Sequence, residues 1–271
     1  MALPALDYTA PFAQPVDRGL YGAADLVDVA PRMSGGVRVW PVNCEPAAGA
    51  WPADPCADTG GLSKDGERGD PLPVFDPIVV WGYDACAPDE PEAAIVERAE
   101  HSLRFGERTI VEAAFAERGL SDAVAPDTVE SLVGAVSAAE AALAPLRRNG
   151  VLHAAPALAA PLEAAGQIIR SGNTLRSPMG HRWSFGAGYV DADGFDRSTI
   201  LATSPVTVWR DAVTTNAALD PHTRDRVAVA ERMVVAFYEC APFAVNVSGD
   251  GMTAAMRPGD FPGANTFPGT E

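Results

Sequence analysis

The chain has 271 residues, of which 47% are hydrophobic and 21% charged, and its formal net charge is −16. This length is enough for one large or two modest domains with buried cores, and the composition excludes a wholly disordered chain. The acidic excess repels a bare phosphate backbone, which argues against sequence-reading DNA binding but not against enclosing DNA.

Membrane and export signals are missing from the sequence pattern. No stretch approaches 18 apolar residues, so neither a transmembrane helix nor membrane contact is predicted. The first seven residues lack the basic and apolar regions of a signal peptide. Without export, the default expectation is a reducing cytosol and free thiols, and the sequence leaves open whether the cysteines are free or paired. These cysteines lie far apart in the sequence, at Cys44, Cys56, Cys86 and Cys240.

The first third of the chain predicts an arm and a long loop. Residues 1–36 are rich in Ala, Pro, Gly and Asp, which indicates an extended arm that needs another surface, or a frayed terminus. Residues 37–81 start with a short alternating strand, 37–40, and end with the apolar run 74–81. The Gly- and Pro-rich middle favours a long excursion that packs on a neighbouring molecule.

A long helix is predicted over residues 89–118. Asp89 is a suitable N-cap, and Pro91 suits the first turn. Gly106 is expected to kink or split the helix, and Gly119 to end it. The apolar residues recur at helical spacing, at Ile95, Ala99, Leu103, Ile110 and Ala114, with Val111 and Phe115 beside the last two.

A second, amphipathic helix is predicted to begin at Asp127, with Glu130 at the capping-box position, and to stop at Pro145. A short strand at 151–153 follows, and then a short helix from Pro156 that Pro161 would interrupt. The later strand candidates are residues 167–170, 182–185, 198–203, 205–210, 232–239 and 243–247. Residues 248–271 are rich in Gly and Pro and indicate an exposed tail.

Catalytic and cofactor motifs are missing from this pattern. There is no Gly-x-Ser-x-Gly elbow, no phosphate-binding loop and no zinc spacing of Cys or His. We therefore predict no catalytic residue, no metal and no cofactor. Turn chemistry explains Asp191, Asp193 and Asp196 better than a calcium loop does. The four histidines are scattered, at His101, His153, His181 and His222.

Three tryptophans lie on or beside the 37–81 excursion, at Trp40, Trp51 and Trp81. They either anchor this excursion on its own domain or serve as anchors between subunits.

The order of these elements resembles the HK97-fold major capsid proteins of tailed bacteriophages, in which an N-arm, an extended loop, a spine helix, and P and A domains follow one another. Residues 149–153, 175–185 and 232–247 are also similar to the family's strand and turn segments. Pro161 departs from the expected helix, and residues after Val247 have no counterpart. The resemblance implies an α+β, HK97-like fold. Its parts would be an arm (1–36), an extended loop (37–81), a spine-helix region (82–125), a mixed α/β domain (126–247) and a flexible tail (248–271).

The resemblance implies assembly and not catalysis. The chain would form hexamers and pentamers of an icosahedral head that encloses phage DNA, in a virion assembled in the host cytoplasm. Portal, scaffold or decoration proteins would be further partners. Some relatives cross-link a loop lysine to another subunit, and Lys64 is the only lysine here, although an ordinary turn lysine is the alternative.

Three alternatives stay open beside this interpretation. One is an encapsulin-type compartment shell, and another is a different virion component. The third is a soluble enzyme whose site would combine His153, His181, Asp191 and Asp193, provided that these side chains converge.

Overall fold

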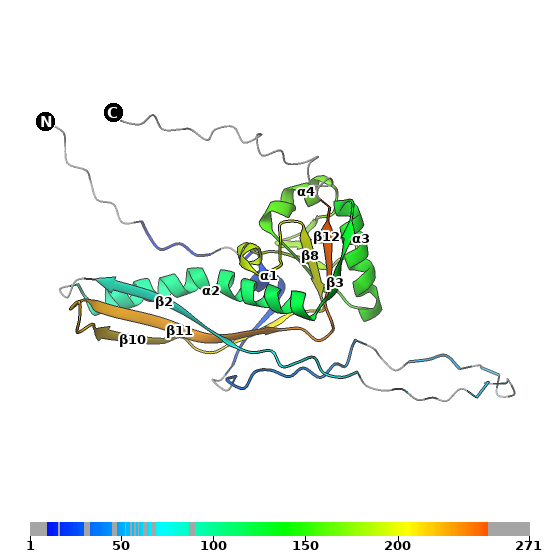
Figure 1. Ribbon diagram of the computed structural model, residues 1–271, viewed down its shortest axis with the longest axis horizontal. Coiled ribbons are helices and arrows are strands. Elements are labelled where there is room, and N and C mark those ends of the chain that lie inside the picture. Colours follow the sequence, from blue (N-terminus) through cyan, green and yellow to red (C-terminus); the bar gives the residue numbers. More distant parts are fainter. Residues whose placement is uncertain are drawn as a thin grey trace, which may run out of the picture.

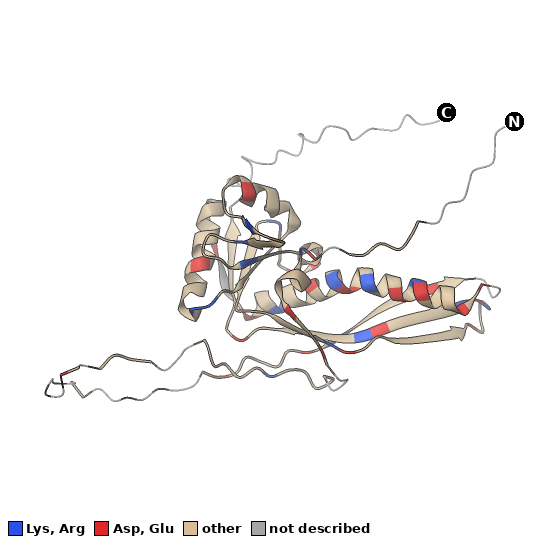
Figure 2. Cartoon of the chain, turned by 180° about the vertical axis from the view of Figure 1, so that it is seen from behind, with Lys and Arg blue, Asp and Glu red and all other residues tan. Residues whose placement is uncertain are grey.

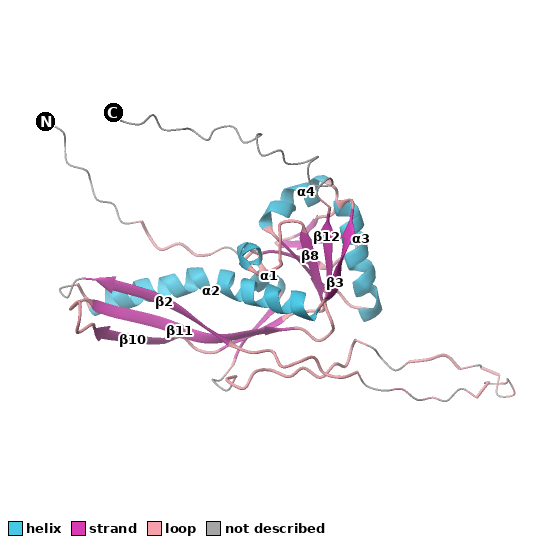
Figure 3. Cartoon of the chain, in the orientation of Figure 1, coloured by secondary structure: helices cyan, strands magenta, loops and turns pink. Residues whose placement is uncertain are grey.

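The computed structural model describes residues 10–15, 17–29, 33–44, 48–51, 69–86 and 90–248, together with 53–54, 56, 58, 60–61, 64 and 66. At 124–126 it describes the backbone alone. The elements form two parts, an elongated layer in which one long helix lies along a sheet, and a rounder part in which a second sheet carries shorter helices (Figures 1 and 3).

The elongated layer is built on strand β11 (Arg226–Phe237). One edge of β11 pairs along nine residues with the antiparallel strand β2 (Ile78–Cys86). The other edge pairs first with β10 (Thr214–Leu219) and then with β9 (Thr207–Arg210). The short strand β1 (Asp25–Asp28) runs parallel to β9 and completes the sheet.

The long helix α2 (Glu92–Asp122) packs on β2 and β11 through one buried face. The prediction of a long helix here is confirmed, but two of its details are wrong. Gly106 does not split the helix, and Gly119 does not end it. Gly119 instead packs against Leu201, since a Cβ there would lie 2.6 Å from Leu201 Cδ2. The predicted N-cap Asp89 lies outside the described residues, and Pro91 occupies the N-cap position.

After Leu103 the buried stripe of α2 follows only part of the predicted set of apolar residues. Ile110 is 46% exposed, whereas Val111 and Phe115 lie in the core. Val111 and Phe115 follow Leu103 at steps of four residues. Because an α-helix has about 3.6 residues per turn, such steps move the buried face gradually around the helix axis.

The rounder part is a seven-stranded mixed sheet in the order β3-β12-β8-β4-β7-β6-β5. The strands are β3 (Val124–Val129), β4 (Val151–Ala154), β5 (Ile169–Ser171), β6 (Thr174–Arg176), β7 (Arg182–Phe185), β8 (Thr199–Thr203) and β12 (Phe243–Val247). The helices are α1 (Leu20–Ala23), α3 (Leu132–Leu143) and α4 (Ala159–Ala164), with the 3-10 turns η1 (Ala144–Leu146), η2 (Pro156–Leu158) and η3 (Ala187–Asp191). Helix α3 packs on β8 and β12 and buries Ala135, Val136 and Ala139.

Helix α3 begins later than predicted. Its N-cap is Ser131, whose Oγ accepts a hydrogen bond from the Gly134 amide, and not Asp127. Residues 124–129 instead form β3, which lies parallel to β12. The pairing of this segment with a strand over 110 residues away in sequence overrides the local capping signal.

Several strand boundaries also differ from the sequence expectation. The predictions for 182–185 and 243–247 are confirmed, whereas β11 begins six residues before the predicted Arg232. Strands β1 and β10 were not predicted, because their mostly exposed residues carry no apolar alternation. The predicted strand 37–40 is only an isolated bridge between Val37 and Phe75.

Acidic and basic side chains are interspersed along α2 (Figure 2). Among the described helices, none combines the length and apolar character needed to cross a bilayer.

The close contact between α2 and β2 predicts opposite effects for two glycines. A Cβ at Gly82 would lie 2.2 Å from the Leu103 amide nitrogen and 2.3 Å from the Ala99 carbonyl oxygen. Gly82→Ala should therefore lower the free energy of unfolding by about 1–3 kcal/mol. Gly106→Ala, whose Cβ would meet only Ile110 Cδ1 at 3.8 Å, should raise it by about 0.5–1 kcal/mol. Urea unfolding of the dissociated chain measures both, and equal effects would contradict this packing.

Candidate functional site: the base of the long loop

The residues of the possible enzyme site do not converge. His153 on β4 is fully buried, with Nδ1 2.8 Å from the Tyr189 hydroxyl and Nε2 2.9 Å from the Thr203 hydroxyl. Burial lowers the pKa of His153 to about 3, so the ring is a neutral core residue at physiological pH. Asp191 and Asp193 are exposed and therefore do not share its surroundings.

The other histidines also have structural surroundings. His181 Nδ1 accepts a hydrogen bond of 2.9 Å from the Gly150 amide, and burial lowers the pKa of this ring. His101 stacks on Phe12, and His222 lies in an exposed turn. Within the described part of the chain, no three His, Cys, Asp or Glu side chains are placed to hold a metal ion.

The base of the loop between Val37 and β2, residues 37–77 and hereafter the long loop, is held by a disulfide between Cys44 and Cys240. The two cysteines are 196 residues apart, with Cα atoms separated by 5.3 Å. The expectation of free thiols is therefore wrong for this pair, because the turn after β11 brings Cys240 to the loop. Cys56 is a free, exposed thiol, whereas the Cys86 thiol hydrogen-bonds to Glu90.

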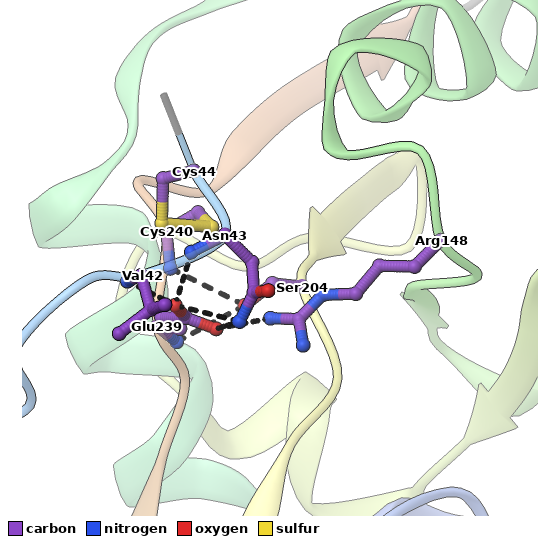
Figure 4. The surroundings of a disulfide bond; sticks show 7 residues. All are labelled: Val42, Asn43, Cys44, Arg148, Ser204, Glu239 and Cys240. Carbon is purple, nitrogen blue, oxygen red and sulfur yellow. Dashed lines mark hydrogen bonds and ion pairs between the residues drawn. A yellow bond between two sulfur atoms is a disulfide. The ribbon is translucent and has the colours of Figure 1, made fainter. Parts of the chain in front are cut away.

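Glu239, next to Cys240, binds the outgoing segment of the loop (Figure 4). Its carboxylate accepts hydrogen bonds from the amides of Val42 and Asn43, at 2.5 and 2.7 Å, and from the Asn43 side chain. It also forms an ion pair with Arg148. Partial burial opposes ionisation of Glu239, but these donors together lower its pKa. The carboxylate thus stays charged and holds the loop backbone.

The Ser204 hydroxyl fixes the same turn from the other side. Its oxygen accepts hydrogen bonds from the amides of Glu239 (3.0 Å) and Cys240 (3.3 Å). The residues that hold the loop are therefore themselves anchored on the segment between β8 and β9 (Figure 4).

The returning segment of the long loop is fixed by the C-terminal part of α2. Arg118 donates hydrogen bonds of 2.8 Å to the carbonyl oxygens of Pro73 and Val74 and lies over the Phe75 ring. Phe75 is buried and contacts the Tyr238 ring edge-on at 5.0 Å. Tyr238 in turn donates a hydrogen bond to Asp122. Both ends of the loop are thus attached around Tyr238, Glu239 and Cys240.

The described parts of the loop extend away from the body (Figure 1), and exposed aromatic residues lie on the loop and beside it. Trp40 is 58% exposed, and Trp81 on the outer face of β2 is 61% exposed. Trp51 is also exposed, with the Lys64 ammonium 4.7 Å from its ring centroid. Trp40 and Trp81 thus do not anchor the loop on their own chain, which leaves large apolar surfaces for a contact with another molecule.

Comparisons by sequence find neither a matching family profile nor a matching curated protein. Solved structures match over nearly the whole chain. The capsid of a native GTA particle aligns with a TM-score of 0.55 at 14% identity, over 89% of this chain and 100% of that chain. A chain of Mycobacterium phage Adephagia aligns with a TM-score of 0.54 at 13% identity, over 90% and 95%. The SrpI encapsulin complex of Synechococcus elongatus gives 0.54 at 11% identity, over 91% and 96%.

The chain has an HK97-like capsid fold. Two mixed sheets and one long helix are arranged as this α+β fold requires, so the fold predicted from element order is confirmed. The HK97-like order was readable from the sequence, whereas the features that hold the loop base were not. Glu239 appeared only as part of a polar turn, and nothing in the spacing of four cysteines pointed to the Cys44–Cys240 pair.

The buried His153 predicts a pH dependence of stability. Its ring stays neutral in the folded chain down to about pH 3 but takes up a proton near pH 6.5 when unfolded. The unfolded state therefore binds more protons between these values, and stability falls on acidification by up to about 1.4 kcal/mol per pH unit from this residue. His153→Gln should flatten this slope in urea unfolding measured from pH 7 downwards. An unchanged slope would contradict the burial of a neutral ring.

The Glu239 contacts predict a local effect at the loop base. With the disulfide reduced, Glu239→Gln should speed hydrogen exchange of the Val42 and Asn43 amides and lower stability by about 1–3 kcal/mol, because a charged acceptor of several bonds is lost. The matched control is Glu163→Gln, which removes the exposed ion pair with Arg170 and should change stability by less than about 1 kcal/mol. Similar results for both variants would show that Glu239 does not hold the loop.

Proposed function

We propose that the chain is a major capsid subunit that assembles into hexamers and pentamers of an icosahedral shell enclosing phage DNA. The observation that carries this proposal is the long loop, which is fixed at its base and extends from an HK97-like body with exposed aromatic side chains. An element held this firmly at one end, with no core of its own in the described part, gains stability only by packing on another copy.

The chemistry of the described residues favours a role in assembly over a role in catalysis. His153 and His181 are held by structural hydrogen bonds, and the solved structures with the same fold include the GTA capsid and the encapsulin complex. The net charge of −16 suits a wall that confines DNA without gripping it, because an acidic surface limits adhesion to phosphates.

In this proposal the divisions of the chain take the roles that the family resemblance implies. Residues 1–36 serve as the arm, 37–81 as the extended loop, 82–125 as the spine-helix region, 126–247 as the mixed α/β domain and 248–271 as the tail. The particle is a virion assembled in the host cytoplasm without membrane contact. Portal, scaffold or decoration proteins act as further partners.

An encapsulin-type compartment is the second candidate, because the encapsulin complex aligns as well as the Adephagia chain does, each with a TM-score of 0.54. The contents of purified particles separate the two functions. Packaged DNA supports the capsid, and an enclosed cargo protein supports the compartment.

Electron microscopy of the expressed chain tests the proposal, with closed shells or capsomer rings as the expected result. Replacing residues 48–70 by a short Gly-Ser linker should leave the circular dichroism and the folded body unchanged, because the contacts of the loop base lie outside this range. The same variant should form no closed shells. A full chain that stays monomeric under all conditions, or a shortened chain that assembles normally, would overturn the proposal.

A further inference from the structure

We propose that the Cys44–Cys240 pair is a redox-controlled lock: when the disulfide forms, it fixes the direction in which the long loop leaves the body. The biological role of this lock rests on the proposed shell function. In the dithiol state the outgoing segment beyond Pro41 is held by hydrogen bonds to Glu239. In the disulfide state it is tied covalently to the connection between β11 and β12.

The loop base contains two kinds of attachment that respond differently to reduction. The hydrogen bonds from Val42 and Asn43 to Glu239 and the Arg148 ion pair do not depend on redox state. Each of these bonds is exchangeable with water, so together they hold the loop while still allowing it to swing. The disulfide adds a bond that does not open without a reductant, and it lies two residues from Val42.

The position of the bond makes it specific for the loop. Cys44 belongs to the outgoing segment, and the returning segment is held separately by Arg118 and Phe75. Neither cysteine lies within a helix or strand. Opening the bond therefore leaves both sheets and α2 intact and frees only the direction in which the loop leaves the body.

The accessibility of the two sulfurs gives the order of the oxidation. Cys240 is buried, whereas Cys44 is half-buried at the edge of the body. A small disulfide such as oxidised glutathione reacts with the Cys44 thiolate, which forms a mixed disulfide and releases one thiol. The Cys240 thiolate then displaces the second thiol and closes the protein disulfide. Two protein thiols are oxidised, one small disulfide is reduced, and the released thiols take up both protons.

The lock would separate assembly from stabilisation in time. A reducing cytosol keeps both thiols reduced, so the loop can adjust its direction as copies meet. On release into an oxidising medium, the bond closes and fixes the loop in the direction it has reached. The shell would then become more resistant to disruption without any change in its contacts.

Two measurements test the lock, with Cys44→Ser as the variant and Cys56→Ser as the matched control, since Cys56 is the exposed thiol outside the pair. In the first, the unassembled chain is treated with dithiothreitol or with oxidised glutathione, and hydrogen exchange is followed by mass spectrometry. Oxidation should slow exchange at Val42 and Asn43 by about tenfold or more in the wild type and in Cys56→Ser. Cys44→Ser should exchange as the reduced wild type does in both media.

In the second measurement, particles assembled under dithiothreitol are exposed to oxidised glutathione and then disrupted with urea. Wild-type and Cys56→Ser particles should need more urea after oxidation, whereas Cys44→Ser particles should assemble but show no such gain. The lock is overturned if oxidation changes neither exchange nor resistance, or if Cys44→Ser gains as much as the wild type. The lock also fails if reduced chains do not assemble while oxidised chains do. A chain that forms no particles in either medium refutes the shell function, and the exchange measurement still decides whether the loop is redox-controlled.

Discussion

The close packing of α2 against the backbone of β2 is the constraint on which the other elements depend. Gly82 allows the two backbones to come into contact, and the same helix also contacts strands of both sheets. Its buried Glu112 accepts hydrogen bonds from the amides of Leu20 and Gly188, which attaches α1 and η3 to the helix. Burial raises the pKa of Glu112 against the effect of these donors. Near its C-terminal end, Gly119 admits Leu201 of the second sheet.

Three consecutive residues after β11 attach the long loop to this body. Tyr238 packs on Phe75 and Phe115 and hydrogen-bonds to Asp122, Glu239 binds the outgoing backbone, and Cys240 forms the disulfide. Hydrophobic contact, charge-assisted hydrogen bonding and a covalent bond thus converge within one short turn. A loop with so little core of its own needs such a base, because contacts at its far end with another molecule would otherwise only bend it.

The features predictable from sequence were those encoded locally. The long helix and the strands 182–185 and 243–247 follow from the spacing of apolar residues, and the order of elements was enough to predict an HK97-like fold. Features that depend on distant pairing were missed. The local capping signal at Asp127 predicts the start of a helix where β3 forms, because the strand's partner β12 is remote in sequence. Strand β1 carries no apolar alternation. The Cys44–Cys240 bond and the role of Glu239 arise only when residues about 196 positions apart meet, and no local pattern marks them.

The positions of β11 and β12 have a consequence for the order of folding. Strand β11 lies inside the first sheet, between β2 and the pair β10 and β9, and β12 lies inside the second, between β3 and β8. Both strands follow their sheet partners in the chain, so neither sheet can close before these strands have been made. A chain that stops before β12 lacks a strand from the interior of the second sheet, not from its edge. The neighbouring strands then expose unpaired backbone groups, which proteases and chaperones recognise. The topology therefore makes the closure of each sheet depend on a strand that is synthesised after its partners.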